Sequence, residues 1–404
     1  MNTKIKPELL SPAGDMERLE FAVKYGADAV YLGGKSFGMR ANPENFTFEQ
    51  LREAVKFAHN NNVKVYLTCN IVPHNDDIEQ YKEYIETAYS CGVDAAIVSD
   101  IGILSLTKKY VPDLDVHIST QAGVTNYVTA NELYNMGASR VVLARELSID
   151  EIKKIRDNTP PGLDIEVFGH GAMCVSFSGR CLLSSYLTSR DANRGECAQP
   201  CRWGYYLVEE KRPNELYKVF EDERGSYILN AKDMCMLEHI DKLVSAGISS
   251  IKIEGRAKSL YYTAVVTNAY RCAIDNHLTN KENPQWLLDE VKKVSHREYC
   301  TGFFFGDGKN NQYYENAGYV RNFDIVGIVD KCQDGYLYIT QRNKFSVGDE
   351  IELLESGKKP IQFIVDNMFN ENGQSISDAA HALMKLKIKS DICVEPMSIL
   401  RKQK

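Results

Sequence analysis

The chain has 404 residues, of which 44% are hydrophobic and 25% are charged, and these fractions exclude intrinsically disordered and collagen-like proteins. Its formal net charge of −7 excludes a protein that binds nucleic acid through its overall charge, so any such contact has to come from a local basic patch. The N-terminus lacks the apolar segment of a signal peptide, and no stretch reaches the ~18 apolar residues of a membrane span. We therefore expect a cytoplasmic protein without membrane contacts.

A unit of helix, glycine and short apolar run recurs along the first 250 residues. Glycine directly after a helix supplies the left-handed conformation that ends it, and the run that follows is short and apolar enough to be a buried parallel strand. This pattern predicts repeated αβ units. The four clearest copies cover residues 25–32, 91–98, 136–143 and 246–253.

Eight such apolar runs are present, with amphipathic stretches such as 48–60, 76–90 and 128–136 between them. Eight strands that alternate with helices predict a TIM-like (β/α)8 barrel. A doubly wound sheet is the alternative, but no G-x-G-x-x-G follows the first run. The predicted strands are residues 8–10, 29–32, 64–68, 95–99, 115–119, 140–144, 164–168 and 250–254.

The connection between the seventh and eighth strands spans about 80 residues, far more than an ordinary loop. Five of the eleven cysteines lie in or beside this insertion, which we place at residues 170–245, whereas an even spread would put about 1.7 there. The first four follow the pattern C-x6-C-x15-C-x3-C. The five are Cys174, Cys181, Cys197, Cys201 and Cys235.

Clustered cysteines in a reducing compartment bind metal or perform redox chemistry more often than they form disulfides. A structural zinc site usually has two short cysteine pairs, but here only Cys197 and Cys201 form one. Iron–sulfur clusters accept irregular spacing and suit a ligand set made of cysteine alone. The spacing leaves three readings open: an iron–sulfur cluster, zinc, or core cysteines that bind nothing.

Beyond the barrel, the pattern changes from helices over 259–276 and 285–294 to short strands with glycine turns. We predict a small C-terminal β-barrel domain at residues 320–404, after a catalytic barrel domain at residues 1–315. A turn of helix is the alternative reading for residues 377–383. The predicted strands are residues 323–329, 336–341, 349–354, 361–367 and 384–388.

The active site of a β/α barrel lies at the carboxyl ends of its strands, and here every predicted strand ends in polar residues or glycine. His170 follows the seventh strand and is a candidate acid or base, with a structural histidine as the alternative. Glu166, Gln121 and Glu254 are further candidate catalytic residues, and Asn70 is a candidate substrate contact.

Arginines near the same strand ends indicate an anionic substrate. Arg40, Arg145 and Arg256 can form bidentate contacts with a carboxylate or phosphate, and Arg180 lies within the cysteine segment. Each one singly is also explained by an ordinary salt bridge, as for Arg145 beside Glu146. Together they favour a small carboxylate or a phosphate as the ligand.

The run at 166–184, EVFGHGAMCVSFSGRCLLS, resembles the signature of the collagenase-like peptidases, peptidase family U32. Supporting similarities are LLSPAG at 9–14, STQ at 119–121, NRGEC at 193–197, AKDMC at 231–235 and IEGR at 253–256. The resemblance covers nearly the whole chain. The length and the appended β-domain look most like the tRNA-modifying branch of that family.

The resemblance implies hydroxylation without O2: prephenate-dependent formation of 5-hydroxyuridine at the tRNA wobble position. It further implies a 4Fe-4S cluster on Cys174, Cys181, Cys197 and Cys235, with Cys201 as the alternative fourth ligand. The implied partners are tRNA, prephenate or another small carboxylate, and a related paralogue subunit. Two alternatives stay open: a metal-dependent peptidase that acts on collagen-like chains, and a non-enzymatic RNA or protein adaptor that holds structural zinc.

Overall fold

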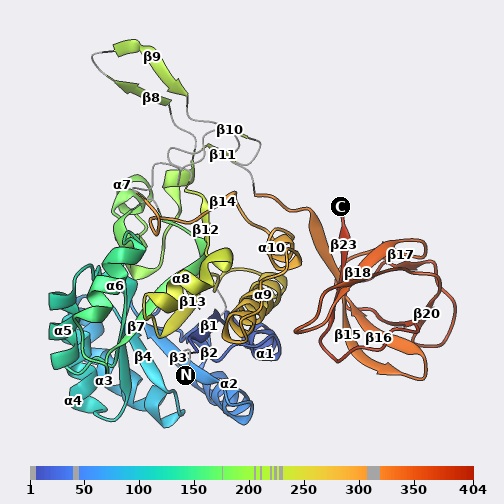
Figure 1. Cartoon of the computed structure of the whole chain (residues 1–404), viewed down its shortest axis with the longest axis horizontal. Coiled ribbons are helices and arrows are strands. Elements are labelled where there is room, and N and C mark those ends of the chain that lie inside the picture. The colour runs from blue at the N-terminus through green and yellow to red at the C-terminus, as the bar shows by residue number, and fades with distance from the viewer. Residues whose placement is uncertain are drawn as a thin grey trace.

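The computed structural model describes residues 6–39, 45–174, 176–203, 231–306 and 319–404, and the backbone of four short strands between 206 and 226. Eight parallel strands form a closed barrel (Figure 1). The last strand of the barrel pairs with both the first and the seventh, which confirms the predicted (β/α)8 barrel and excludes the open doubly wound sheet. In order around the barrel, the strands are β1 (Glu8–Pro12), β2 (Ala29–Gly33), β3 (Lys64–Cys69), β4 (Ala95–Val98), β5 (Asp115–Ile118), β6 (Arg140–Val142), β7 (Asp164–Ala172) and β13 (Ser250–Ile253).

Helices surround this barrel and bury their apolar faces against it. Side-chain caps start most of them; Thr47 and Gln50, for example, form a reciprocal capping box at the start of α2. Gly26 follows α1 with φ +101°, where a side chain would be strained, as the repeated sequence pattern predicts. The helices are α1 (Met16–Lys24), α2 (Phe48–Asn60), α3 (Asn75–Ser90), α4 (Ile101–Tyr110), α5 (Tyr127–Asn135), α6 (Ile149–Asp157), α8 (Ile240–Ser245), α9 (Leu260–Leu278) and α10 (Trp286–Val291).

Inside the barrel, ionised side chains replace part of the apolar core. Arg140 Nη1 donates to Glu8 Oε1 at 2.6 Å and to Glu166 Oε2 at 3.1 Å. The ammonium of Lys252 lies 3.3 Å from the other oxygen of Glu166. These four side chains, which we call the interior charge cluster, are at most 14% exposed and contain two cations and two carboxylates.

The cysteine-rich insertion adds structure above the barrel between β7 and β13. It contains α7 (Leu183–Thr188) and the hairpin of β8 (Tyr206–Glu209) and β9 (Arg212–Lys218), which projects from the body (Figure 1). Strand β12 (Asp233–Cys235) pairs antiparallel with the end of β7 and parallel with β14 (Tyr299–Cys300). The insertion is therefore anchored at one side of the barrel mouth.

The C-terminal domain is an antiparallel seven-stranded sheet that forms half a barrel, which confirms the predicted β-domain. The sequence prediction missed β23, which lies between β18 and β15, and the helical turn at residues 377–383 was wrong because β21 begins there. The strands are β15 (Phe323–Gln333), β16 (Tyr336–Gln341), β18 (Glu350–Leu354), β19 (Ile361–Ile364), β20 (Met368–Asn370), β22 (Lys385–Lys389) and β23 (Ile399–Gln403), with β17 (Phe345–Ser346) and β21 (Asp378–Ala379) as a separate pair.

One disulfide joins Cys332 on β15 to Cys393 in this domain. None of the five clustered cysteines, all of which lie within the described ranges, forms a disulfide. The bonded pair lies outside the cysteine-rich insertion, in the C-terminal domain.

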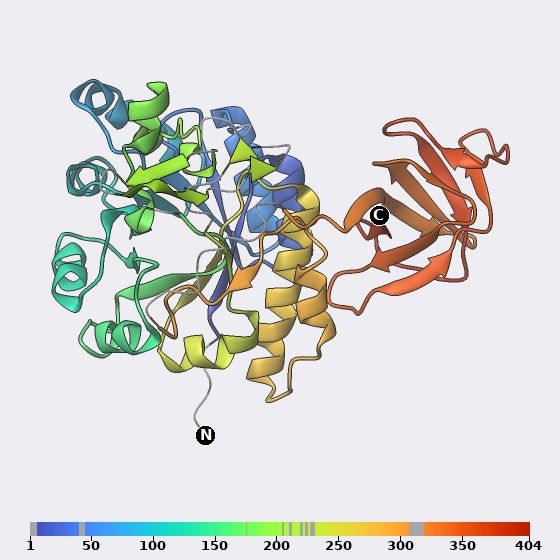
Figure 2. The same cartoon turned by 90° about the horizontal axis from the view of Figure 1, so that it is seen from above.

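The two domains pack against each other along α1, α9 and α10 (Figure 2). Arg401 on β23 is fully buried at this contact, and its guanidinium pairs with Glu290 of α10 and Glu352 of β18. Tyr25 donates from its hydroxyl to the backbone oxygens of Leu354 and Met397. Buried charge pairing of this kind fixes the geometry between the partners.

No helix among the ranges given above is both long enough and apolar enough to span a lipid bilayer.

Removing Arg401 should destabilise the protein strongly, because Arg401→Met leaves the carboxylates of Glu290 and Glu352 buried with less charge compensation. We expect a loss of about 3–5 kcal/mol in the free energy of unfolding, measured by urea denaturation. The matched control is Lys404→Met, since Lys404 forms an exposed pair with Asp324 and should change stability by under about 0.5 kcal/mol. Equal losses in the two variants would contradict a special role for Arg401.

Candidate functional site

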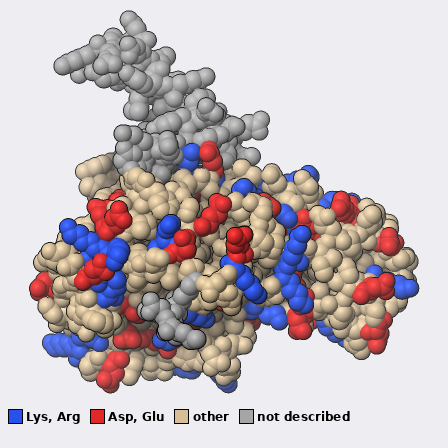
Figure 3. All heavy atoms as spheres, viewed as in Figure 1, with Lys and Arg blue, Asp and Glu red and all other residues tan. Residues whose placement is uncertain are grey.

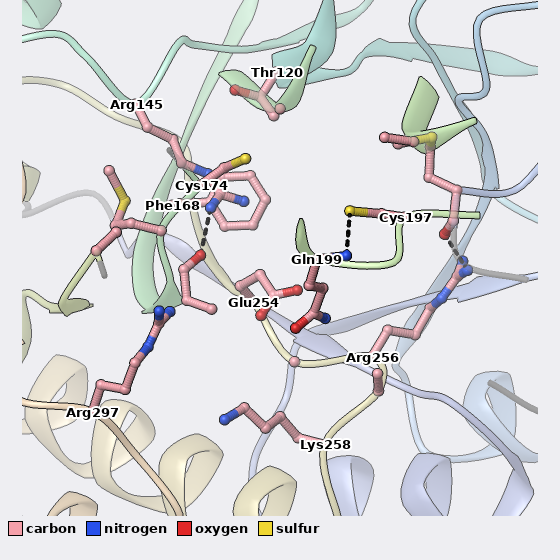
Figure 4. Close-up of a pocket in the computed structure, with 18 of the residues that line it drawn as sticks. Thr120, Arg145, Phe168, Cys174, Cys197, Gln199, Glu254, Arg256, Lys258 and Arg297 are labelled. Atoms are coloured by element: carbon pink, nitrogen blue, oxygen red, sulfur yellow. Dashed lines mark hydrogen bonds between the residues drawn. The ribbon is translucent and has the colours of Figure 1, made fainter. Parts of the chain in front are cut away.

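A cavity of about 710 Å³ opens at the carboxyl ends of the barrel strands and extends under the cysteine-rich insertion (Figure 4). Polar residues that end β3, β5, β6 and β13 line it, as expected for a barrel mouth. The predicted endings of the other four strands, β1, β2, β4 and β7, do not line it. Ser11 bonds instead to Thr267, and Ser99 donates to the backbone oxygen of Ile71.

The cavity lining is richer in cations than in carboxylates. Six basic side chains face three acidic ones, although the chain as a whole is acidic. On the face seen in Figure 3, basic and acidic side chains intermingle over both domains. The mouth therefore carries a local excess of basic side chains. The basic residues are Arg145, Lys252, Arg256, Lys258, Arg297 and Arg321, and the acidic ones are Glu146, Glu254 and Asp324.

Arg256 follows β13 and is held firmly in the wall of the cavity. Its guanidinium donates to Thr68 Oγ1 at 2.6 Å and to the backbone oxygen of Met39. Gly33 leaves room for it, because a Cβ there would lie 2.3 Å from Arg256 Nη1. An arginine that is fixed in this way presents its charge in one orientation, which suits a carboxylate or phosphate.

Arg145 and Lys252 lie beside the ring of Phe168 in the same cavity. The guanidinium carbon of Arg145 lies 3.8 Å from the ring centroid, and Arg145 Nη1 donates to the backbone oxygen of Ala172 at 2.8 Å. Lys252 Nζ lies 5.4 Å from the centroid of Phe168 and 4.3 Å from that of Tyr31. Two cations therefore meet at one aromatic surface.

Two amide side chains at neighbouring strand ends form a rigid polar pair. Asn70 Nδ2 donates to Gln121 Oε1 at 2.8 Å, while Asn70 Oδ1 accepts from the backbone of Met39 at 3.1 Å. The amide nitrogen of Gln121 is buried and has no hydrogen-bond partner among the described residues. A buried donor of this kind is costly unless a ligand satisfies it.

Four of the five clustered cysteines line this cavity: Cys174, Cys181, Cys197 and Cys201. Backbone N–H groups donate to two of the sulfurs, from Leu183 to Cys181 and from Gln199 to Cys197, both at 3.4 Å. Donors of this kind stabilise thiolates and tune metal–sulfur clusters. Figure 4 shows Cys174 and Cys197 on opposite sides of the opening.

Cys235 is the exception, because it sits on β12 beside the barrel and not in the cavity lining. The hydroxyl of Tyr270 lies 3.9 Å from its sulfur, and its backbone is in register with His170 on β7. Within the described ranges, no three histidine, cysteine or carboxylate side chains are gathered closely enough to hold a metal ion. The four thiols at one cavity suit a thiolate-ligated cluster in their chemistry, and Cys201 shares this lining with the other three, whereas Cys235 lies outside it.

The structure separates the predicted catalytic residues into two groups. Gln121 and Glu254 line the cavity, whereas Glu166 and His170 do not. Glu166 belongs to the interior charge cluster beneath the cavity. His170 is fully buried, with Nε2 3.3 Å from the hydroxyl of Tyr299, which favours the alternative of a structural histidine.

The predicted substrate-binding residues are also divided. Asn70, Arg145 and Arg256 line the cavity, while Arg180 is exposed outside its lining and Arg40 lies outside the described residues. The sequence prediction missed Lys252, which lines the cavity from within β13. A single lysine inside an apolar strand is the signal that could have identified it.

Comparisons with known proteins agree with the sequence resemblance. A family model described as Peptidase family U32 matches residues 14–313, and one described as Peptidase family U32 C-terminal domain matches residues 321–401. The chain is 37% identical to tRNA hydroxylation protein P1 of Bacillus subtilis over 99% of this chain and 95% of that protein. It is 36% identical to tRNA hydroxylation protein P of Escherichia coli, over 92% and 91% of the two chains. It is 45% identical to an uncharacterized protease of Methanocaldococcus jannaschii, over 89% and 90%.

The buried state of His170 predicts a pH dependence of stability. Burial, with the nearby charges of His296 and Lys258, lowers the pKa of His170 from 6.5 to about 3. The unfolded chain binds a proton there below pH 6.5 and the folded chain does not, so stability falls as the pH drops from 6.5 toward 3. Proton uptake by this histidine in the unfolded chain should lower the free energy of unfolding by about 2 kcal/mol at pH 5 relative to pH 7.5.

We expect His170→Phe to lose about 2 kcal/mol less stability than the wild type between pH 7.5 and pH 5.0, because phenylalanine takes up no proton. Urea denaturation at the two pH values measures the difference. A parallel decline of both proteins would show that His170 is accessible to protons in the folded state.

Proposed function

Because the chain belongs to peptidase family U32, we propose that its barrel mouth hydroxylates RNA, forming 5-hydroxyuridine at the wobble position of tRNA with prephenate in place of O2. One observation carries the proposal: thiols and cations share a single cavity at the catalytic end of a barrel. The names of the Bacillus subtilis and Escherichia coli relatives support RNA hydroxylation as the reaction class.

The proposed small substrate matches the charge of the mouth. Prephenate carries two carboxylates, and Arg145 and Arg256 both line the cavity that would receive it. Arginine in a partly desolvated wall binds carboxylate more strongly than it does in water. The two arginines therefore have the role of orienting the acid before reaction.

The proposed RNA substrate reaches the mouth as a single nucleotide. A wobble base is unpaired in the anticodon loop, so it can enter a barrel mouth without the cost of opening a duplex. Gln121 supplies a buried amide donor with no protein partner in the described residues, and a uracil carbonyl oxygen is a suitable acceptor for it. Glu254 lines the same cavity and is the candidate proton acceptor.

The C-terminal sheet offers a docking face for the rest of the RNA. Lys387 lies 4.7 Å from the ring centroid of Tyr336, and Lys331 lies 4.5 Å from that of Tyr338. Lys385 and Lys389 extend the same face along β22. Lysine beside aromatic rings suits phosphates and unstacked bases, so this face is the proposed tRNA contact.

The proposed cofactor is a 4Fe-4S cluster on Cys174, Cys181 and Cys197, with Cys235 or Cys201 as the fourth ligand. Such a cluster supplies one-electron redox chemistry when bound. The backbone N–H groups of Leu183 and Gln199, which donate to the sulfurs of Cys181 and Cys197, would help to hold and tune such a cluster.

A peptidase is the alternative function, and the name of the Methanocaldococcus jannaschii relative favours it. A cysteine peptidase needs an imidazole base beside its nucleophile. No histidine occurs among the described residues that line the cavity. Release of peptides from gelatin by the metal-loaded protein, abolished by Cys174→Ser, would establish the peptidase in place of the hydroxylase.

Deletion of the gene should remove 5-hydroxyuridine from the wobble position of cellular tRNA. The measurement is mass spectrometry of nucleosides from purified tRNA, in a strain that also lacks any paralogue. Wild-type protein should restore the nucleoside, and Arg256→Met should restore much less of it because the carboxylate contact is lost. Unchanged hydroxyuridine in the deletion strain would reject the proposed function.

Single serine substitutions should identify the cluster ligands. Cys174→Ser, Cys181→Ser and Cys197→Ser are expected to lose most of their iron and acid-labile sulfide after anaerobic purification, because each removes a thiolate. Cys272→Ser on α9, away from the cavity, is the matched control and should keep both. Whichever of Cys201→Ser and Cys235→Ser loses iron identifies the fourth ligand. Zinc in place of iron and sulfide would support the adaptor alternative.

A further inference from the structure

We propose that Lys252 is a nucleophilic lysine that condenses with the ketone of a 2-oxo acid at the bottom of the cavity. The inference rests on the proposed function for the identity of the acid, since prephenate carries such a ketone. The chemistry itself follows from the position of the lysine.

Lys252 points into the barrel, although its neighbours along the strand point outward. Ile251 and Ile253 on β13 belong to the apolar layer between strands and helices, whereas Lys252 lines the cavity. Its side chain is only 6% exposed. The ammonium thus lies at the deep end of a cavity that is open to substrate and closed to most of the solvent.

The surroundings make proton loss from Lys252 easier than for an ordinary lysine. Burial lowers its pKa, Glu166 opposes that shift, and the positive charges of Arg140 and Arg145 reinforce it. Glu166 also accepts a hydrogen bond from Arg140, at 3.1 Å. Glu166 therefore lies between two cations and is placed to take up the proton that Lys252 releases.

The neighbouring groups select a 2-oxo acid among carbonyl compounds. Such an acid carries a carboxylate on the carbon next to its ketone, so a site for it needs a cation close to the amine. Arg145 meets this need, because its guanidinium and the amine of Lys252 contact the same ring of Phe168. The rings of Tyr31 and Phe168 supply an apolar surface for the rest of the molecule.

The proposed step is a condensation that balances without any further reactant. The ammonium of Lys252 passes one proton to Glu166, 3.3 Å away, and the freed electron pair of Nζ forms a bond to the ketone carbon. The ketone oxygen takes up two protons, one returned by Glu166 and one from Nζ, and leaves as one water molecule, and the nitrogen keeps its third proton in the resulting iminium ion. The net change is ammonium plus ketone to iminium plus water.

This step leaves the interior charge cluster neutral. The cluster has two cations and two carboxylates before the reaction, and an iminium ion carries the same single positive charge as the ammonium that it replaces. No buried charge is therefore left without a partner, which would be costly. A lysine with a purely structural role would make the same ion pair and would form no adduct.

Trapping with a reducing agent tests the proposal directly. The full-length protein is incubated with phenylpyruvate and sodium cyanoborohydride, and the adduct is located by intact mass and peptide mapping. We expect one reduced adduct on Lys252 and none in Lys252→Arg, which keeps the charge but cannot form an iminium ion. Lys258→Arg removes the other cavity lysine and should keep the adduct.

An unmodified wild-type protein, or an adduct on Lys258 in place of Lys252, would overturn the proposal. Both results come from peptide mapping of the wild type, so they do not depend on whether a variant folds. Assay of tRNA hydroxylation separates the two proposals. Full hydroxylation by Lys252→Arg overturns the role of Lys252 and leaves the proposed function standing. If the wild-type protein forms the adduct but hydroxylates no tRNA, the proposed function fails and the reactivity of Lys252 stands.

Discussion

Pairing of buried charges inside the barrel constrains everything built above it. Glu8, Arg140, Glu166 and Lys252 come from four different strands and compensate one another at the centre of the barrel. An unpaired charge at this depth would be strongly destabilising. The strands that carry these four side chains therefore have one acceptable register relative to one another. The cluster lies inside the barrel, and its Lys252 reaches the lining of the cavity at the carboxyl ends of the strands.

Above that cluster, basic side chains and cysteine thiols line different parts of one cavity. Arginines that are held by backbone oxygens and by Thr68 occupy one part of the wall, and cysteines of the insertion occupy another. The arginines belong to the rigid barrel, whereas the cysteines belong to short turns in the connection after β7. The two proposed roles, orientation of the substrate by the arginines and binding of a cluster by the cysteines, therefore rest on separate parts of the fold.

The sequence predicted the barrel well because alternation of apolar strands and capped helices is a local property. The prediction of β23 failed because its residues mix apolar side chains with Arg401, whose charge is compensated by carboxylates of α10 and β18 that are distant in the sequence. His170 was predicted at the mouth because it follows an apolar run. However, β7 continues to Ala172, and the imidazole packs against the rings of Tyr270 and Tyr299. Lys252 was missed because an isolated lysine is most often a surface residue.

The buried contact of Arg401 fixes the C-terminal domain relative to the barrel. A domain tied down by a fully buried guanidinium cannot swing on a linker, so the lysine-bearing face of the C-terminal sheet stays at a constant distance from the barrel opening. In the proposed complex with tRNA, a fixed distance between the two contacts would bring only one nucleotide of a bound RNA to the barrel opening. The position of that nucleotide would then be set by the rigid contact between the domains and not by the RNA sequence between the two contacts.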